Sequence, residues 1–326
     1  MERFIEPFLT HYTEMSKANN HMISEAACSA TAEILSRIDR SAVLPHVPLV
    51  AQALSACLGD ASWPVRDASC VAAGSLLRYY GQEVSSATCE AFLDVASTHL
   101  KDAIWSLREN AAIAICEAMK TSDAGLQERM VQFTLDYLTE NLDLAHRRPP
   151  PKGRVITFLS DKQAAALEAS AGQAQRPGEP TATVGPSVWR QGGGWGCCLD
   201  CMETRQGDVY DTSSGALYLL REFAGTPPFA VQACSHLATL WRLLDNGMGN
   251  AAEAGAKKEK LQMSVLKEVP EILTRLCAAS LSAAAAASWR EHRSAVQALA
   301  SGSCNRALSA CAEDCLAACA ALLPSA

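Results

Sequence analysis

The residues best suited to chemistry are the cysteines of a short segment, Trp195–Cys201. Cys198 and Cys201 have the two-residue separation of zinc ligands, and Cys197 adjoins them. A structural zinc site needs four ligands, and no second Cys-x-x-Cys or His-x-x-x-His lies nearby. We therefore favour the interpretation that this segment packs on the rest of the protein without metal, and we keep a metal site as the alternative.

A second group of cysteines falls on one helical stripe, because Cys304, Cys311, Cys315 and Cys319 are separated by seven, four and four residues. Small apolar packing is favoured there over a redox or metal role. The 14 cysteines are scattered along predicted helices, and the N-terminal residues lack the pattern of a secretory signal. We expect a reducing setting in the cytoplasm, with the nucleus as the alternative.

Tryptophan and arginine side chains are the candidates for contact with a partner. Large aromatic rings and guanidinium groups dominate binding energy at protein interfaces. Trp63 and Trp105 lie at predicted helix starts, where packing between helices is favoured over exposure. The basic, proline-broken segment Arg147–Arg154 is most simply a solvated linker; a docking segment for an acidic partner and a polyproline ligand are alternatives. The predicted contact residues are Trp63, Arg66, Trp105, Arg108, Arg147, Arg148, Trp189 and Trp195.

No catalytic constellation is present in the sequence. The 7 histidines are dispersed, and Gly-x-Ser-x-Gly, His-Glu-x-x-His and phosphate-loop motifs are absent. Gly192–Gly194 lacks the Lys-Ser/Thr of a phosphate loop. We predict a protein that is not an enzyme and needs no cofactor.

Composition excludes further classes of function. The net charge of −7 argues against a general binder of nucleic acid or anionic membrane. The most alanine-rich run, Ala278–Ser288, is too short to span a bilayer. Abundant alanine favours helices that approach closely. The predicted partner is another protein, with no nucleic acid and no membrane insertion.

The elements that would position these residues are given by a duplicated stretch. Leu58–Ser69 and Leu100–Ala111 share an Asp, a Trp three residues on and an Arg three residues later, at a constant offset of 42 residues. Self-similarity at this period is typical of a helical-repeat array. Each copy reads as an amphipathic first helix and a second helix that is apolar over more of its circumference, as expected for an inner layer.

The period places about six helix pairs along the chain. The expected pairs are 1–16 with 22–37, 43–58 with 64–80, 85–100 with 106–120, 127–142 with 209–223, 227–245 with 259–279, and 284–300 with 303–322. Between Val65 and Val209 lie two periods plus 60 residues, so an insertion falls inside the fourth pair. Its Pro149–Pro151 run cannot continue a helix. The predicted organisation is N-terminal repeats (1–145), a flexible insertion (146–206) and C-terminal repeats (207–326) of the same array.

This motif resembles the HEAT repeat, a relative of the armadillo repeat. The resemblance implies an all-α, right-handed α-α superhelix. It also implies that Asp60 with Arg66 and Asp102 with Arg108 stack between neighbouring units as a polar ladder. The first copy departs from this pattern, because Ala18 and Ser24 occupy the equivalent places.

Such a resemblance implies a scaffold or adaptor that presents an extended surface to a protein partner, with possible membership of a larger complex. We expect the contact site near the insertion, because the loops that interrupt the array share one ridge. Two other classes stay open. One is a lyase of the HEAT-like kind that attaches bilin pigments, and the other is an importin-like cargo carrier.

Overall fold

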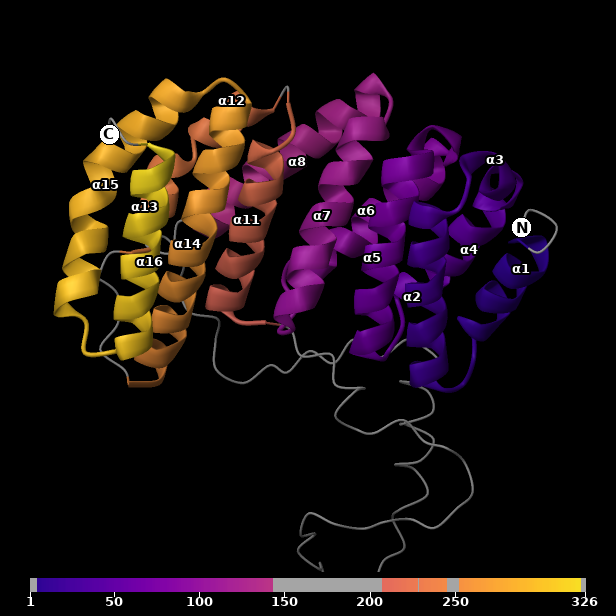
Figure 1. Ribbon diagram of the computed structural model, residues 1–326. Helices are drawn as coiled ribbons and strands as arrows, with labels where there is room; N and C mark the ends of the chain where they lie inside the picture. The colour runs from indigo at the N-terminus through magenta and orange to yellow at the C-terminus, as the bar shows by residue number, and fades with distance from the viewer. Residues whose placement is uncertain (1–4, 143–206, 228, 245–251, 324–326) are drawn as a thin grey trace, which may run out of the picture.

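The chain forms an array of paired helices, and no strand occurs in 5–142, 207–227, 229–244 or 252–323, the residues that this computed structural model describes (Figure 1). The first helices of successive pairs are α1 (Ile5–Met15), α4 (Val47–Leu58), α6 (Ser86–His99), α8 (Ala124–Leu142), α12 (Ala230–Cys234) with α13 (Leu237–Arg242), and α15 (Ser282–Gly302). The second helices are α2 (His21–Arg37), α5 (Trp63–Tyr80), α7 (Trp105–Thr121), α11 (Val209–Ala224), α14 (Ala252–Ala278) and α16 (Arg306–Leu322). Short turns of helix, α3 (Arg40–Val43), η2 (Leu44–His46) and η3 (Gly81–Glu83), join some of them. The predicted all-α superhelix of about six pairs is confirmed.

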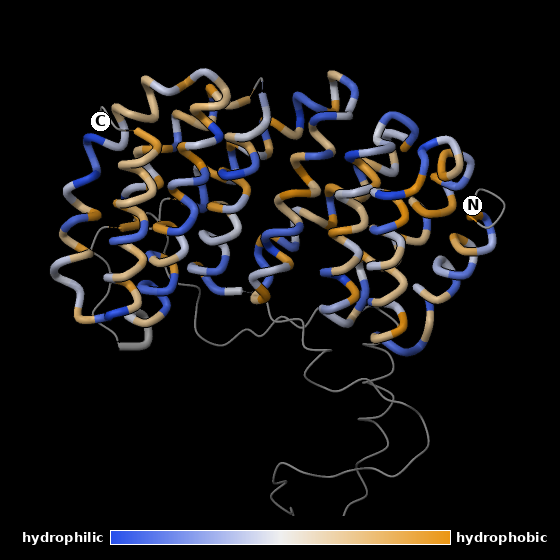
Figure 2. The backbone as a smooth tube through the Cα atoms, viewed as in Figure 1, coloured by the Kyte–Doolittle hydropathy of each residue, from blue (hydrophilic) through white to orange (hydrophobic). Residues whose placement is uncertain are grey.

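The second helices make one continuous layer. α2 packs on α5, α5 on α7, α7 on α11, α11 on α14 and α14 on α16. Their burial explains this: Leu107, Ala111 and Ala118 of α7 are fully buried, and small side chains let the neighbouring backbones approach. Hydrophobic segments therefore run along the whole array instead of gathering at one centre (Figure 2).

The array continues from α8 to α11, which are the two helices of the fourth pair. α11 packs on both α7 and α8. Gly215 also lets α11 approach the turn between α6 and α7 closely, because a Cβ added there would lie 2.0 Å from the Leu100 carbonyl oxygen. The predicted insertion between these two helices is confirmed. The expected flexibility of 146–206 lies outside the described residues, and the domain boundaries stay a prediction.

The fifth pair departs from the predicted boundaries. The single helix expected at 227–245 is two shorter helices, α12 and α13, which meet at Ser235 and His236. The Ser235 hydroxyl donates to the Gln232 carbonyl at 2.6 Å, a local bond that competes with helix continuation. α14 begins before the expected residue 259.

One helical stretch of the described residues, Arg40–Leu58, is long and apolar enough to cross a membrane. Within the array its apolar side chains have another role. Val47, Val50 and Leu54 are buried, and α4 packs against α5 and α6. The apolar composition of this stretch is therefore that of a core helix.

A ladder of carbonyl contacts joins the first helices of pairs one to four. The carbonyl oxygens of Ser16, Leu58 and Leu100 are spaced by one repeat period. Each accepts a hydrogen bond from a side chain of the following pair: the Cys57 thiol at 3.5 Å, the His99 Nε2–H at 2.8 Å and the Tyr137 hydroxyl at 3.1 Å, respectively. Carbonyls at a helix end lack intrahelical donors, so these side chains satisfy groups that would otherwise be buried unpaired.

The buried His99 predicts a pH-dependent stability. Burial lowers the pKa of His99 to about 4; Arg66 adds to this effect, while the Leu58 carbonyl and Asp102 oppose it. A histidine with a depressed folded-state pKa binds its proton more readily in the unfolded chain. We therefore expect full stability above pH 6.5 and a progressive loss of up to about 3 kcal/mol as the pH falls towards 4. Urea unfolding of the wild type and His99→Gln between pH 8 and 4 measures this loss. The variant should be less stable at pH 8 and should lose less on acidification, and equal pH slopes would contradict the prediction.

Candidate functional site

The polar ladder implied by the repeat motif is present and buried. Arg66 donates to the Asp102 carboxylate of the next pair at 3.1 Å and to the Asp60 carbonyl of its own turn at 2.9 Å. The side chains of Arg66 and Asp102 are 4% and 11% exposed. Arg108 repeats the arrangement, donating to the Asp102 carbonyl at 2.6 Å and to Asp211 at 3.0 Å. Each arginine thus joins its own turn to the following pair.

The first pair keeps only half of this arrangement. Ser24, in the position of the arginine, donates to the Ala18 carbonyl at 3.2 Å or the Met15 carbonyl at 3.4 Å. The donor-to-carbonyl separation of six residues is the same as in Arg66–Asp60 and Arg108–Asp102. A hydroxyl is too short to reach the next pair as well, so the rung between pairs one and two is lost.

The predicted contact residues divide into two groups. Arg66 and Arg108 are buried and engaged within the array, and Trp63 is half-buried. Trp105, in contrast, is exposed to solvent over 61% of its surface. The expectation that Trp105 packs between repeats is therefore wrong: α7 meets α11 through Arg108 and Glu109, and the first residue of the helix, Trp105, stays uncovered. The remaining candidates lie outside the described residues: Arg147, Arg148, Trp189, Trp195 and the cysteines Cys197, Cys198 and Cys201.

Trp105 lines a groove of about 670 Å³ between α7, α11 and α14, which we call the inner groove. α7 also contributes Arg108 and Glu109, and α11 contributes Tyr218 and its first turn. The first turn of α11 is held by a capping box, in which Asp208 accepts from the Asp211 N–H and Asp211 accepts from the Asp208 N–H. The groove thus lies beside the start of α11, the second helix of the fourth pair.

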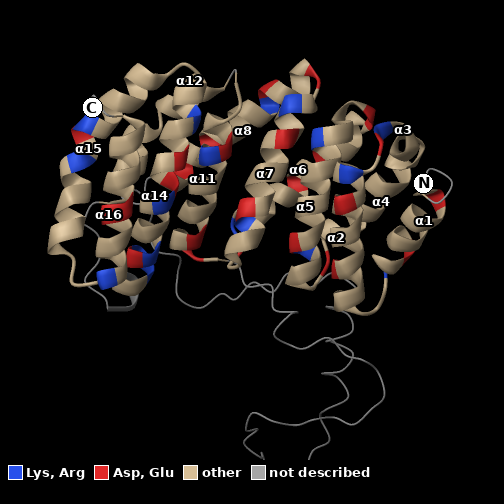
Figure 3. Cartoon of the chain, viewed as in Figure 1, with Lys and Arg blue, Asp and Glu red and all other residues tan. Residues whose placement is uncertain are grey.

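One wall of the inner groove is a stripe of lysines on α14. Lys257, Lys260, Ser264 and Lys267 are spaced by three, four and three residues, so they share one helical face, and all four line the groove. Lys257 pairs with Asp208, whereas Lys260 and Lys267 have no ion pair within the described part of the chain. Across the molecule acidic and basic residues are interspersed, so this same-sign stripe is a local feature (Figure 3).

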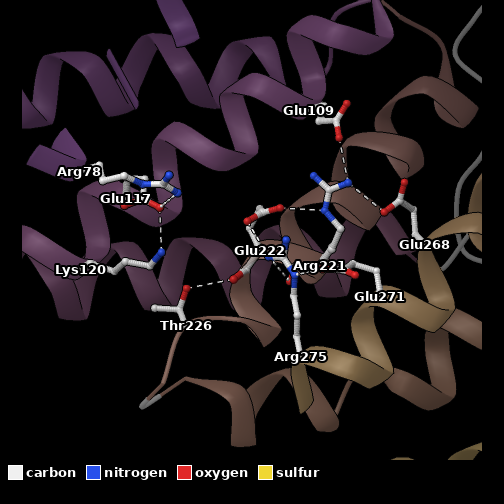
Figure 4. Close-up of polar contacts among 10 residues, drawn as sticks. All are labelled: Arg78, Glu109, Glu117, Lys120, Arg221, Glu222, Thr226, Glu268, Glu271 and Arg275. Carbon is white, nitrogen blue, oxygen red and sulfur yellow. Dashed lines mark hydrogen bonds and ion pairs between the residues drawn. The ribbon is translucent and has the colours of Figure 1, made fainter. Parts of the chain in front are cut away.

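Beneath the groove, Arg221 of α11 joins three helices (Figure 4). Its guanidinium lies 2.9 Å from Glu109 of α7, 2.9 Å from Glu268 of α14 and 2.8 Å from Glu222. Arg275 continues the network at 2.7 Å from the other oxygen of Glu222. We call these five residues the Arg221 network.

Electrostatics in the network follow from burial and from this pairing. Burial raises the pKa of Glu268, with Arg221 partly opposing the rise. For Arg221, burial disfavours the charge, but the surrounding carboxylates outweigh it and the pKa is raised. The acids are therefore held by internal cations and are not free to bind a ligand.

Sequence reasoning missed the inner groove. The lysine spacing was readable on the helix expected at 259–279, but nothing in the sequence shows which helix face meets which neighbour. The juxtaposition of Trp105 with Lys260 joins residues from the third and fifth pairs across the insertion.

The apolar packing that the sequence favoured for Cys304, Cys311, Cys315 and Cys319 holds for only some of these cysteines. Cys315 and Cys319 of α16 are buried, Cys311 is half-buried and Cys304 is exposed. Most of the described cysteines are free and buried. Within the described residues, no three His, Cys, Asp or Glu side chains group as metal ligands.

Comparison with solved structures finds armadillo repeat proteins. A designed armadillo repeat protein matches with 13% identity and a TM-score of 0.37, covering 95% of this chain and 99% of that one. A second designed armadillo repeat protein, in complex with the peptide (KR)4, matches with 13% identity and a TM-score of 0.39, over 95% and 98% of the two chains. A chain from a structure of the interaction between cadherin and beta-catenin matches with 13% identity and a TM-score of 0.37, over 97% of this chain and 53% of that one. No family model and no curated protein sequence matches the chain. The helical-repeat fold expected from the motif is shown by the chain's own paired helices and by the buried contacts of Arg66 and Arg108.

The buried ladder predicts a large loss of stability when one rung is broken. Arg66→Met keeps most of the side-chain volume but leaves Asp102 without its cation, and we expect a loss of about 3 kcal/mol in the free energy of unfolding. Arg37→Met is the matched control, because Arg37 pairs with Glu33 at the surface and is 76% exposed. The control should change stability by less than about 1 kcal/mol. Similar losses in the two variants, measured by urea unfolding, would count against a structural role for the ladder.

The Arg221 network predicts a loss that acid partly repairs. Arg221→Met leaves Glu109 and Glu268 without a cation and Glu222 with Arg275 alone, and we expect a loss of about 3 to 5 kcal/mol at pH 7. The folded-state pKa of Glu268, already raised by burial, should rise further once Arg221 is gone. A raised carboxyl pKa makes the folded state bind protons more readily, so the deficit should shrink between pH 7 and pH 5. Arg129→Met, which breaks an exposed pair with Glu90, is the control. A deficit that is independent of pH would contradict this account.

Proposed function

We propose that the protein is a non-enzymatic adaptor that binds an acidic segment of a protein partner in the inner groove. The observation that carries this proposal is the exposure of Trp105 at a groove whose opposite wall holds Lys260 and Lys267. The setting we propose is cytoplasmic, which is supported by the cysteines of the described residues, which are free and mostly buried.

The exposed ring supports a site for a partner. A tryptophan that is 61% exposed loses hydrophobic stabilisation in the isolated protein. Indole rings at the edge of a cleft serve as anchors at interfaces, because they bury much area with few rotatable bonds. Tyr210 and Tyr218 line the same groove and extend its aromatic surface.

The charge available in the groove supports an acidic partner. Each lining carboxylate is paired internally: Asp208 with Lys257, Asp211 with Arg108, and Glu109 and Glu268 with Arg221. Lys260 and Lys267 keep ammonium groups that meet no acid in the described residues. The charge left for a ligand is therefore positive, and carboxylate or phosphate groups complement it. This location adjoins the insertion, where the loops were expected to mark the contact site.

A peptide selection tests the proposal. A displayed library of random 12-residue peptides is selected on the full-length protein, and the selected peptides are measured by fluorescence anisotropy. We expect acidic sequences with at least one apolar residue. Trp105→Ala, and Lys260→Glu with Lys267→Glu, should each weaken binding at least tenfold, which is about 1.4 kcal/mol.

Two control variants probe the same chemistry elsewhere on the array. Phe8→Ala removes another exposed aromatic ring, which is 52% exposed, and Lys17→Glu reverses an exposed charge on the first pair. Both should bind the selected peptides as the wild type does. Selection of basic peptides, or binding that survives both groove variants, would overturn the proposed site.

A further inference from the structure

A second groove lies on the other layer of the array, between α6 and α8 with α7 as its floor. Its volume is about 490 Å³, and we call it the outer groove. Leu93 of α6, Ile115 of α7 and Met130 and Phe133 of α8 supply its apolar surface. Phe133 is 37% exposed there, although it belongs to the apolar face of its helix.

The outer groove exists because the spacing of the first helices changes at this point. α1 packs on α4 and α4 packs on α6, but α6 and α8 are not in comparable contact. α8 packs mainly on α11 instead. At the earlier junctions a neighbouring first helix covers the apolar face, and at this junction that cover is missing.

The rim of the outer groove carries an excess of negative charge. Glu90 and Asp94 lie one helical turn apart on α6 and both line the groove. Arg129 of α8 pairs with Glu90 across the opening. Asp94 has no cationic partner among the described residues. An occupant with a lysine or arginine beside its apolar face would complement this rim.

The backbone chemistry of the groove selects a helix as its occupant. The walls are helices whose N–H and C=O groups are already bonded within each helix, so the groove offers no ladder to an extended strand. A strand lying there would depend on water and side chains for the N–H and C=O groups that face the groove, whereas a helix satisfies them internally. The lining residues span Glu90 to Ser97 on α6 and Leu126 to Phe133 on α8. Seven residues of helix rise by about 10 Å, which corresponds to about two turns of a bound helix.

We propose that the outer groove binds an amphipathic helix of a protein partner, with apolar residues at i, i+4 and i+7 in the groove and a basic residue opposite Asp94. This surface is independent of the inner groove. α7 contributes to both, with Trp105 on one side and Ile115 on the other. A protein with the two surfaces occupied would hold an acidic segment and a basic amphipathic helix at the same junction of the array.

A library of helix-forming peptides tests the outer groove. The peptides are 14 residues long in design (about four helical turns), are randomised along one face, and are selected on the full-length protein. We expect selected peptides with an apolar i, i+4, i+7 pattern and a flanking Lys or Arg, and photo-crosslinks from them to α6 and α8. Asp94→Lys should weaken binding at least tenfold, and replacing the peptide's basic residue by Glu should restore binding to that variant. Phe133→Ser should weaken binding to both peptide forms.

The controls separate this proposal from the alternatives. Glu128→Lys reverses an exposed charge on α8 that does not line the groove and should leave affinity within about twofold. Trp105→Ala should not change it either, so failure of the inner groove and failure of the outer groove are distinguishable. Crosslinks elsewhere, selected peptides without a basic residue, or affinity unchanged in Asp94→Lys would overturn the proposal. Concentration-dependent dimers that Asp94→Lys abolishes would also overturn it, since a second copy would then fill the groove.

Discussion

The array depends on a buried arginine at the start of a second helix. Arg66 bonds to carbonyls of its own turn and to the carboxylate of the next turn, so one side chain fixes both the local bend and the contact with the neighbour. Turns between packed helices carry backbone groups that no helix satisfies, and their burial is favourable only with such partners. The carbonyl ladder through Cys57, His99 and Tyr137 has the same purpose at the ends of the first helices.

Both grooves lie where this regular pattern changes. Arg66 pairs with Asp102, which lies in the turn before α7. At the inner groove, Arg108 pairs instead with Asp211, which lies within α11 itself. α11 therefore meets α7 through its capped first turn, and Trp105 is left uncovered. At the outer groove, α8 follows α11 away from α6 and exposes apolar surface between them. The insertion lies between α8 and α11 in the chain, so it falls at the junction where both grooves lie.

The Arg221 network shows how the array tolerates this irregular junction. Pairs three, four and five are joined by one guanidinium that contacts Glu109, Glu222 and Glu268. A buried ion pair contributes little by itself because its desolvation opposes its attraction. Its geometric specificity is more important here, since only one placement of α11 lets Arg221 reach acids on both neighbours. Arg221 also holds α14 through Glu268, and the lysine stripe of α14 lines the same groove as Trp105.

The sequence by itself determined the repeat period, the helix pairs and which residues of successive repeats are equivalent. A constant offset of 42 residues fixes which residues are equivalent, and hydrophobic spacing fixes which face of each helix is buried. It therefore predicted the all-α array and the place of the insertion, whereas the Asp–Arg ladder, and its departure at Ser24, followed from the resemblance of the motif to the HEAT repeat. Only the tertiary structure decided the exposure of Trp105, the break between α12 and α13, and the two grooves. These depend on the angles and separations between neighbouring helices, which arise from packing among residues of several pairs and leave no periodic mark in the chain.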